Sequence, residues 1–294
     1  MIEILKSPIN NSLLKPYLKC LDNTVSQEEF SILKDELSDL LITSPRPKIQ
    51  DLGSYYESES YISHTDSKHT LLDKIYQIVK KYSITKKVGL VQSFMNANSS
   101  EKSVLDIGCG TGDFLLACKK GGLNIYGIEP NEKAKSIAEI KLNQKIKVDI
   151  FKLSPQQFDC ISMWHVLEHV PNLTDYILEL QKKLKPKGVL IIAVPNHKSY
   201  DAKHYGKFWA AFDVPRHLWH FSKKSIQLLF EKNKMKVTKT IPMRFDSFYV
   251  SILSEKYKTK KGNFIKALFI GLKSNIKAMR TKEYSSIIYI IKNS

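Results

Sequence analysis

Three glycines and two carboxylates in this chain have the spacing of a nucleoside-binding site. The stretch Asp106-Ile-Gly-Cys-Gly-Thr-Gly112 follows an apolar run, and a second apolar run ends in the carboxylate of Glu129. Glycine lets the backbone adopt a positive φ and come close to a ligand. An acidic side chain at the tip of the next strand can accept hydrogen bonds from ribose hydroxyls. The pattern predicts a strand, a tight glycine turn, a helix and a second strand that together hold a nucleoside.

The spacing of the glycines decides which nucleoside is expected. A dinucleotide fingerprint reads G-x-G-x-x-G, but here residue 113 is Asp and the pattern is D-x-G-x-G-x-G. The sequence contains no G-x-x-x-x-G-K-[ST], so it has no P-loop. The motif resembles the first motif of class I S-adenosylmethionine-dependent methyltransferases.

This resemblance implies S-adenosyl-L-methionine as the cofactor and a role for each matching position. Glu129 would bind the ribose hydroxyls, Asp149 or Phe151 would lie near the adenine, and Trp164 would end a neighbouring strand in the same crevice. The methionine and ribose parts would face the motif itself, which means Asp106, Gly108, Cys109, Gly110 and Gly112. From the residues alone, Glu129 could instead be a favourable charge at the start of the helix that follows Pro130.

A second constellation, at 164–171, reads Trp-His-Val-Leu-Glu-His-Val-Pro. Its His165, Glu168 and His169 match the H-x-x-E-H spacing of one group of zinc metalloproteases. That chemistry needs both histidines on one continuous helix, whereas a strand-like run precedes His165 and Pro171 ends the segment. We therefore expect no metal site. The alternatives left open are a catalytic role, which we consider for His165, and a buried structural pair of Glu168 with His169.

The same stretch resembles the segment after the fourth strand in small-molecule methyltransferases related to those of ubiquinone and menaquinone biosynthesis. In that family Leu167, Glu168 and His169 would help to shape the wall beside the cofactor. The resemblance also places a loop that covers the substrate after the fifth strand, where His217 and His220 lie.

His217 and His220 are candidate catalytic bases, because the pKa of a histidine lies near neutrality. A positioned base contributes about 10²–10⁴-fold. The alternative is a polar loop in which one histidine packs on an aromatic ring. Orientation of the nucleophile alone can contribute about 7–11 kcal/mol, so positioning by Trp164, His165 and residues 208–220 is the expected mechanism.

Strands alternate with helices along the chain, which predicts an α/β fold with a parallel sheet. We expect a Rossmann-like, doubly wound seven-stranded sheet with helices on both faces. The expected strands are 104–107, 124–129, 147–151, 158–164, 188–194, 235–243 and 285–292. The expected helices are 70–93, 113–120, 132–142, 173–184 and 222–231.

Residues 1–67 differ in character and are expected to form an N-terminal cap. They resemble the cap of a bacterial subset of these enzymes, but Cys20 stands alone there, so a metal-binding version is not expected. The methyltransferase domain would occupy 68–294, with a helical insertion at 245–284 before the last strand.

The net charge, the apolar runs and the cysteines of the chain indicate which partners and which cellular compartment to expect. The 294 residues carry a formal net charge of +17, which fits either a lysine-rich solvated surface or a partner that bears phosphates. We expect a cytoplasmic protein with reduced thiols, because no signal peptide or long apolar run is seen and the cysteines show no paired spacing. The cysteines are Cys20, Cys109, Cys118 and Cys160.

The segment 264–279 predicts a basic amphipathic helix. Lysines at 266, 273 and 277 fall largely off an apolar stripe formed by residues 264, 265, 268, 269, 272, 276 and 279. Such a helix could cover the sheet as part of the core, lie on an anionic membrane and present a lipid-soluble substrate, or serve another contact.

The expected function is methyl transfer to a small-molecule or lipid-like acceptor, at oxygen or carbon. One alternative is a nucleic-acid-binding protein, or an RNA or DNA methyltransferase, which the charge supports. The end of the fourth strand argues against it, because it reads Ser162-Met-Trp-His165 rather than Asn/Asp-Pro-Pro-Tyr/Phe. The second alternative is a non-catalytic nucleoside-binding module, against which the intact glycine motif argues.

Overall fold

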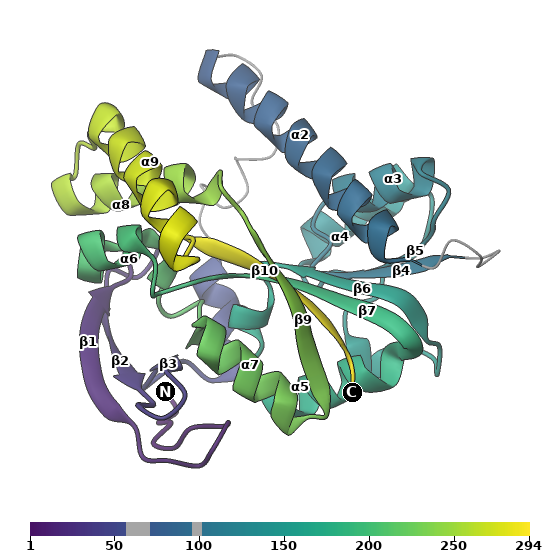
Figure 1. Ribbon diagram of the computed structural model, residues 1–294, viewed down its shortest axis with the longest axis horizontal. Coiled ribbons are helices and arrows are strands. Elements are labelled where there is room, and N and C mark those ends of the chain that lie inside the picture. Colours follow the sequence, from purple (N-terminus) through teal and green to yellow (C-terminus); the bar gives the residue numbers. More distant parts are fainter. Residues whose placement is uncertain (57–70, 96–101) are drawn as a thin grey trace.

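The computed structural model describes residues 1–56, 71–95 and 102–294, and only the backbone of 71–78. A twisted six-stranded sheet forms the centre of the molecule (Figure 1), in the order β5-β4-β6-β7-β10-β9. Its strands are β4 (Ser103–Ile107), β5 (Asn124–Ile128), β6 (Phe158–Trp164), β7 (Leu184–Pro195), β9 (Met235–Pro242) and β10 (Ser286–Asn293). The expected α/β sheet is present, with six strands where we expected seven.

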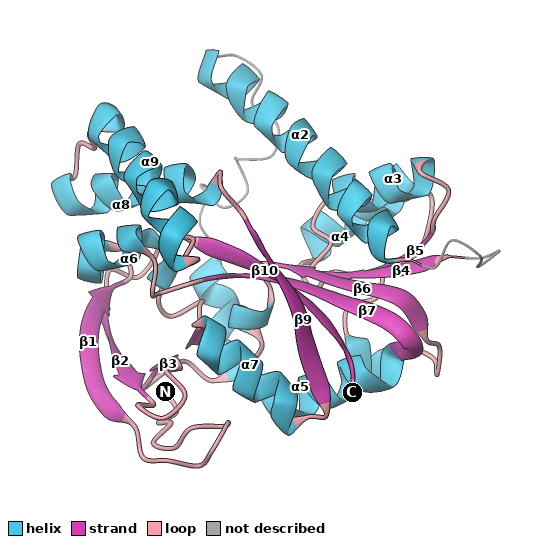
Figure 2. Cartoon of the chain, in the orientation of Figure 1, coloured by secondary structure: helices cyan, strands magenta, loops and turns pink. Residues whose placement is uncertain are grey.

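Helices cover both faces of the sheet, as expected (Figure 2). On β7, Val189, Ile191 and Ala193 join the core formed with one set of helices, whereas Leu190, Ile192 and Val194 join the core of the other set. From Gly188 to Val194 this strand has no polar side chain, because both of its faces are buried there. The first set is α2 (Leu71–Phe94), α3 (Asp113–Lys120) and α4 (Glu132–Leu142), and the second is α5 (Leu173–Lys183) and α7 (Lys223–Lys232).

The strand expected at 147–151 is reduced to one parallel bridge between Lys147 and Ile128. After it, the Asp149 side chain accepts a hydrogen bond from the Phe151 N–H at 3.1 Å and caps the short 3-10 helix η2 (Ile150–Lys152). An Asp side chain that bonds nearby backbone in this way competes with a strand ladder, which accounts for the missing strand.

The last strand of the sheet runs against its neighbours. β10 is antiparallel to both β7 and β9, with Tyr289 opposite Ile192 and Thr240. The chain between β9 and β10 forms the helical pair expected at 245–284, which is α8 (Asp246–Thr259) and α9 (Phe264–Thr281). None of the helices in the described residues has the length and apolarity needed to span a bilayer.

The N-terminal residues form a second, antiparallel sheet that the sequence did not predict. It has the order β1-β2-β3-β8, with β1 (Lys15–Leu21), β2 (Glu29–Lys34), β3 (Leu41–Thr43) and β8 (Trp219–His220). Leu41 pairs with His220 and Ile42 with Trp219. One strand of this sheet therefore comes from the expected substrate loop, while the boundary expected near residue 67 lies outside the described residues.

A buried ion pair joins the two parts. Arg216 donates to Asp22 at 2.8 Å and to Asp213 at 2.7 Å, and its Nη1 donates to the Tyr55 carbonyl. Burial by itself would raise the pKa of Asp22, but hydrogen bonds from Arg216 and from the backbone of Ser26 and Thr24 hold that pKa well below its usual range. The N-terminal sheet is thus fixed to the loop by charge as well as by strand pairing.

Replacing Arg216 with methionine should strongly destabilise the protein, because the Asp22 carboxylate is left buried without its partner. We expect a loss of about 3–5 kcal/mol in the free energy of unfolding at neutral pH, measured by urea denaturation. Because folding depresses the pKa of Asp22, this contribution is present above about pH 4 and is lost as the pH falls towards the folded pKa.

Lys19→Met is the matched control, since it removes one partner of the exposed Lys19–Glu29 pair. Exposed pairs are screened by solvent, so its effect should be small. Equal losses in the two variants would contradict a special role for the Arg216 ion pair.

Candidate cofactor and acceptor site

The glycine turn after β4 is fastened to the end of β5. The backbone N–H groups of Gly108 and Cys109 both donate to the carbonyl of Ile128, at 2.8 and 3.0 Å. Gly108, Gly110 and Gly112 have φ values of 70°, 54° and 81°, which side chains with a Cβ rarely adopt. The sequence motif is therefore a turn that needs glycine at all three positions.

The three glycines also differ in what surrounds them. A Cβ on Gly108 would lie 2.5 Å from Val166 Cγ2, and one on Gly112 would lie 3.1 Å from Leu142 Cδ1. A Cβ on Gly110 would meet nothing within 4 Å. Gly108 and Gly112 thus permit internal packing, whereas Gly110 leaves its backbone open to a ligand.

Glu129 joins the tip of β5 to this turn. Its Oε2 accepts from the Gly110 N–H at 2.8 Å, and its Oε1 accepts from the Asn131 N–H at 2.9 Å. Burial raises the pKa of Glu129, although these two hydrogen bonds oppose the rise. The side chain of Asn131 caps α4 by accepting from Ala134, so capping of that helix does not depend on Glu129.

Asp106 lies buried below the turn and accepts from the Ser162 hydroxyl at 2.6 Å. Burial raises the pKa of Asp106 well above its usual range, while Ser162 and Lys87 oppose the rise. Lys87 comes from α2 and was missed by the sequence reasoning. Its Nζ lies 4.4 Å from the ring centroid of Trp164, and burial lowers its pKa.

Several features at the ends of β4, β5 and β6 fit a nucleoside with a charged tail. The indole N–H of Trp164 is buried and donates to no described residue, and its ring packs edge-on against Phe114. The open backbone at Gly110 and the carboxylate of Glu129 lie on the adjacent turn. Burial raises the pKa of Cys109, so its thiol stays protonated. Asp149 is half-buried and caps η2.

His165 follows β6 and is held between two carboxylates. Its Nε2 lies 2.9 Å from Asp246 of α8, and its Nδ1 lies 3.4 Å from Glu168. Burial opposes its charge, but the bonds to Asp246 and Glu168 prevail and raise the pKa of His165 to about 10. The sequence singled out His165, yet nothing in it indicated Asp246, which lies 81 residues away.

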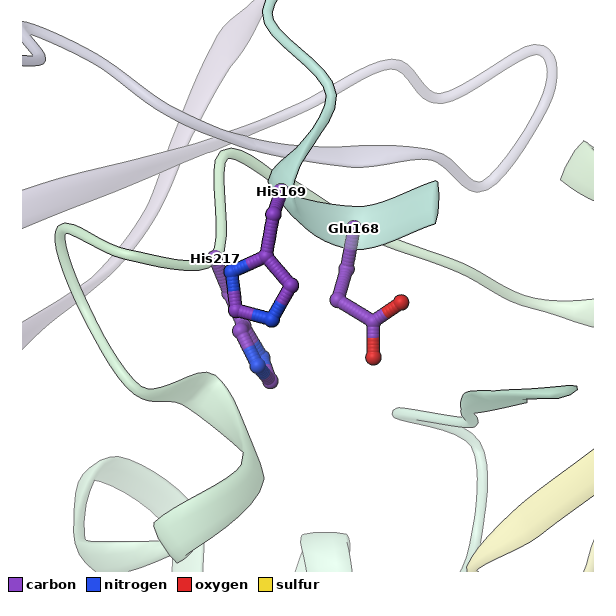
Figure 3. Close-up of side chains that lie close together, drawn as sticks. All are labelled: Glu168, His169 and His217. Atoms are coloured by element: carbon purple, nitrogen blue, oxygen red, sulfur yellow. The ribbon is translucent and has the colours of Figure 1, made fainter. Parts of the chain in front are cut away.

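Glu168, His169 and His217 form a cluster (Figure 3), and Glu168 also pairs with His165. Glu168 and His169 belong to the short helix η3 (Leu167–His169), and all three side chains point into one space. Glu168 is fully buried and accepts no hydrogen bond of normal geometry from the described residues. Its ion-pair partner is His165.

The hydrogen bonds of the two histidines differ, and those of His217 assign its proton. Nδ1 of His169 contacts the carbonyl of Arg216 at 3.1 Å, and Nδ1 of His217 contacts the carbonyl of Ala211 at 2.8 Å. A carbonyl only accepts, so Nδ1 of His217 carries the proton. Nδ1 of His169 also lies 2.9 Å from the Tyr56 hydroxyl, which can donate to it or accept from it. Donor atoms of Glu168, His169 and His217 lie within 4.8 Å of one another, so this group could hold a metal ion such as zinc. The expectation of no metal site stays a prediction.

His220 is the most confined of the candidate histidines. Its Nε2 lies 3.0 Å from the Thr43 hydroxyl, which donates to the carbonyl of His217. Burial lowers the pKa of His220 well below its usual value. The structure therefore brings His217 and His220 together, with ring centroids 6.5 Å apart. His165 is connected to them through the side chain of Glu168.

Sequence comparison decides the family. The profile of a family described as a methyltransferase domain matches residues 81–240, more than half of the chain. This chain belongs to that family. It is 34% identical over 110 residues to the ubiquinone biosynthesis O-methyltransferase of Dechloromonas aromatica, and 30% identical over 146 residues to that of Rickettsia bellii. These matches cover 34% and 46% of this chain and 47% and 59% of the relatives, so the chain spans about half the length of the curated relatives it matches.

Solved methyltransferases share the fold. Magnesium protoporphyrin IX methyltransferase from Synechocystis PCC 6803, with bound S-adenosylhomocysteine, matches with a TM-score of 0.53 and 17% identity, over 81% of this chain and 97% of that one. A putative sarcosine dimethylglycine methyltransferase from Galdieria sulphuraria matches with a TM-score of 0.51 and 14% identity, over 74% and 86%. The chain thus contains an S-adenosylmethionine-dependent methyltransferase domain.

His165 should stay protonated at neutral pH because Asp246 and Glu168 stabilise its charge. In an NMR titration its ring resonances should not move between about pH 5 and 8, and Asp246→Asn should bring the midpoint down towards neutrality. The folded pKa is raised above the unfolded 6.5, so the stability that this charge contributes is complete below about pH 6.5 and is lost as pH rises through about 10.

Asp175→Asn, at an exposed carboxylate on α5, is the control and should leave the His165 resonances unchanged. A wild-type midpoint near 6.5 would contradict the assignment.

Proposed function

We propose that this domain transfers the methyl group of S-adenosyl-L-methionine to a small-molecule, lipid-like acceptor, at oxygen or carbon. The observation that carries the proposal is the open backbone at Gly110, hydrogen-bonded to the buried carboxylate of Glu129. The relatives named ubiquinone biosynthesis O-methyltransferases support an acceptor of this kind. We also propose a cytoplasmic location.

The cofactor would lie across the ends of β4, β5 and β6. Each oxygen of Glu129 accepts one N–H and keeps a lone pair, with which it would bind the ribose hydroxyls. Trp164 would give its unpartnered indole N–H to the same ligand. The remaining residues of the proposed site are Asp106, Gly108, Cys109, Gly110, Gly112 and Asp149.

The bound cofactor supplies an electrophilic methyl group. The chain must orient a nucleophile in line with it, and orientation alone can contribute about 7–11 kcal/mol. We propose His217 as the base, because its Nδ1–H is used by Ala211 and its Nε2 is left to accept a proton. His165 already holds a proton between carboxylates and would position Glu168 and α8, and His220 would hold the loop against β3.

Glu129→Gln should weaken binding of both S-adenosylmethionine and S-adenosylhomocysteine. Loss of a hydrogen bond to a charged group costs about 1.5–3 kcal/mol, which is roughly a tenfold to hundredfold rise in Kd, measured by isothermal titration. Glu132→Gln, at an exposed position of α4, is the control. Absence of binding to folded wild-type protein would rule out the proposed function.

His217→Asn should lower kcat by about 10²–10⁴-fold and leave the Kd for S-adenosylmethionine unchanged. Asparagine keeps a donor for the Ala211 carbonyl but has no base. The assay would use a panel of phenols that carry apolar chains. His204→Asn, on α6 (Tyr200–Tyr205), is the control. An unchanged rate in His217→Asn would exclude His217 as the base.

A further inference from the structure

Helix α9 turns its small residues inward. A Cβ on Gly271 would lie 2.9 Å from Phe248 Cα of α8, so the two helices are in close contact at that point. The hydroxyl of Ser274 donates to buried Asp201 at 2.6 Å. The buried face of α9 consists of Ala267, Ile270, Gly271, Ser274 and Ala278.

Its large apolar residues point to solvent instead. They repeat at intervals of four and three residues, which places them on one stripe of a helix, and they are 50–81% exposed: Ile265, Phe269, Leu272, Ile276 and Met279. A surface helix of a globular domain normally turns this stripe towards the core. The possibility that this stripe forms part of the core is therefore wrong for these five residues.

The charged residues of α9 itself have one sign, and one of them, Lys266, pairs with buried Glu255 of α8 at 2.9 Å. α9 contains no Asp or Glu, and its cations are Lys266, Lys273, Lys277 and Arg280. Lys273 and Lys277 lie over the ring of Tyr200, at 5.3 and 4.2 Å from its centroid. Residues 251–294 contain ten Lys and Arg against two Glu, so a second copy of this face would meet like charges.

The stripe lies on α9, and the neighbouring helix α8 contributes a residue to the site. In Figure 1, α8 and α9 lie side by side at the outer edge of the molecule, and α8 supplies the Asp246 carboxylate that holds His165. α8 therefore connects α9 to His165.

We propose that α9 docks this domain on an anionic phospholipid bilayer. An apolar stripe flanked by cations is complementary to such a bilayer. The apolar side chains would enter the boundary of the acyl chains, while Lys and Arg would contact the anionic headgroups. Charge complementarity favours this occupant over a second copy of the chain. Delivery of a lipid-like acceptor from the bilayer to the site rests on the proposed function, whereas docking itself does not.

The test is sedimentation of the full chain with vesicles that contain neither cofactor nor acceptor. Wild-type protein should bind vesicles of phosphatidylcholine and phosphatidylglycerol, and should bind vesicles of phosphatidylcholine alone weakly. The triple variant Phe269→Ser, Leu272→Ser, Ile276→Ser should fall to the weak level. The double variant Lys277→Gln, Arg280→Gln should lower the partition coefficient by about tenfold or more.

Ile137→Ser with Ile140→Ser is the matched control, because these exposed apolar residues lie on α4. It should bind as wild type does. All altered side chains are exposed, so an unchanged thermal midpoint and unchanged binding of S-adenosylhomocysteine would show that the variants are folded.

Failure of wild-type protein to bind anionic vesicles would overturn the proposal. Equal binding by the triple variant would also overturn it, since another surface would then be responsible. A dimer in solution that the triple variant abolishes would assign the stripe to a second copy instead. None of these results depends on methyl transfer, so failure here is distinguishable from failure of the proposed function.

Discussion

The turn that follows β6 is the constraint on which the rest of the site depends. His165 has a φ of 59°, and its N–H donates to the carbonyl of Ala193 in β7. The turn that begins there places Val166 against Gly108 and directs the side chain of Glu168 towards His169 and His217. The carbonyl of Glu168 then accepts the N–H of Leu218 at 2.8 Å. The glycine turn, the helical pair and the loop at 208–220 are therefore all positioned against a few consecutive residues.

Buried charge is the second organising feature. Glu168 would be costly without a neighbouring cation, and His165 supplies one while Asp246 balances it from α8. Lys87 of α2 interacts favourably with the charges of Asp106 and Asp246. The buried carboxylates of the site are thus paired with cations from elements far apart in the chain. This pairing fixes the arrangement of the side chains before any ligand binds.

The sequence predicted the features that depend on neighbouring residues and missed those that depend on residues far apart in the chain. The strands β4 to β7, the glycine turn and α4 follow from periodicity and turn residues within a few positions, and the structure agrees. The direction of β10 was not predictable, because a strand buried on both faces is apolar in either direction. The N-terminal sheet was missed because its fourth strand, β8, lies nearly two hundred residues from its first. Lys87 and Asp246 were missed for the same reason, since each looks like an ordinary charged position on a helix.

The place of β10 has a consequence for how the protein is made. This strand follows all the others in the chain, yet it lies between β7 and β9 in the sheet. While the ribosome is still adding residues 286–293, β7 has an unpaired edge and β9 has no neighbour in the sheet. Unpaired edges of this kind invite pairing with other chains. The nascent chain therefore carries a vulnerable half-built sheet until its final strand emerges and closes the gap.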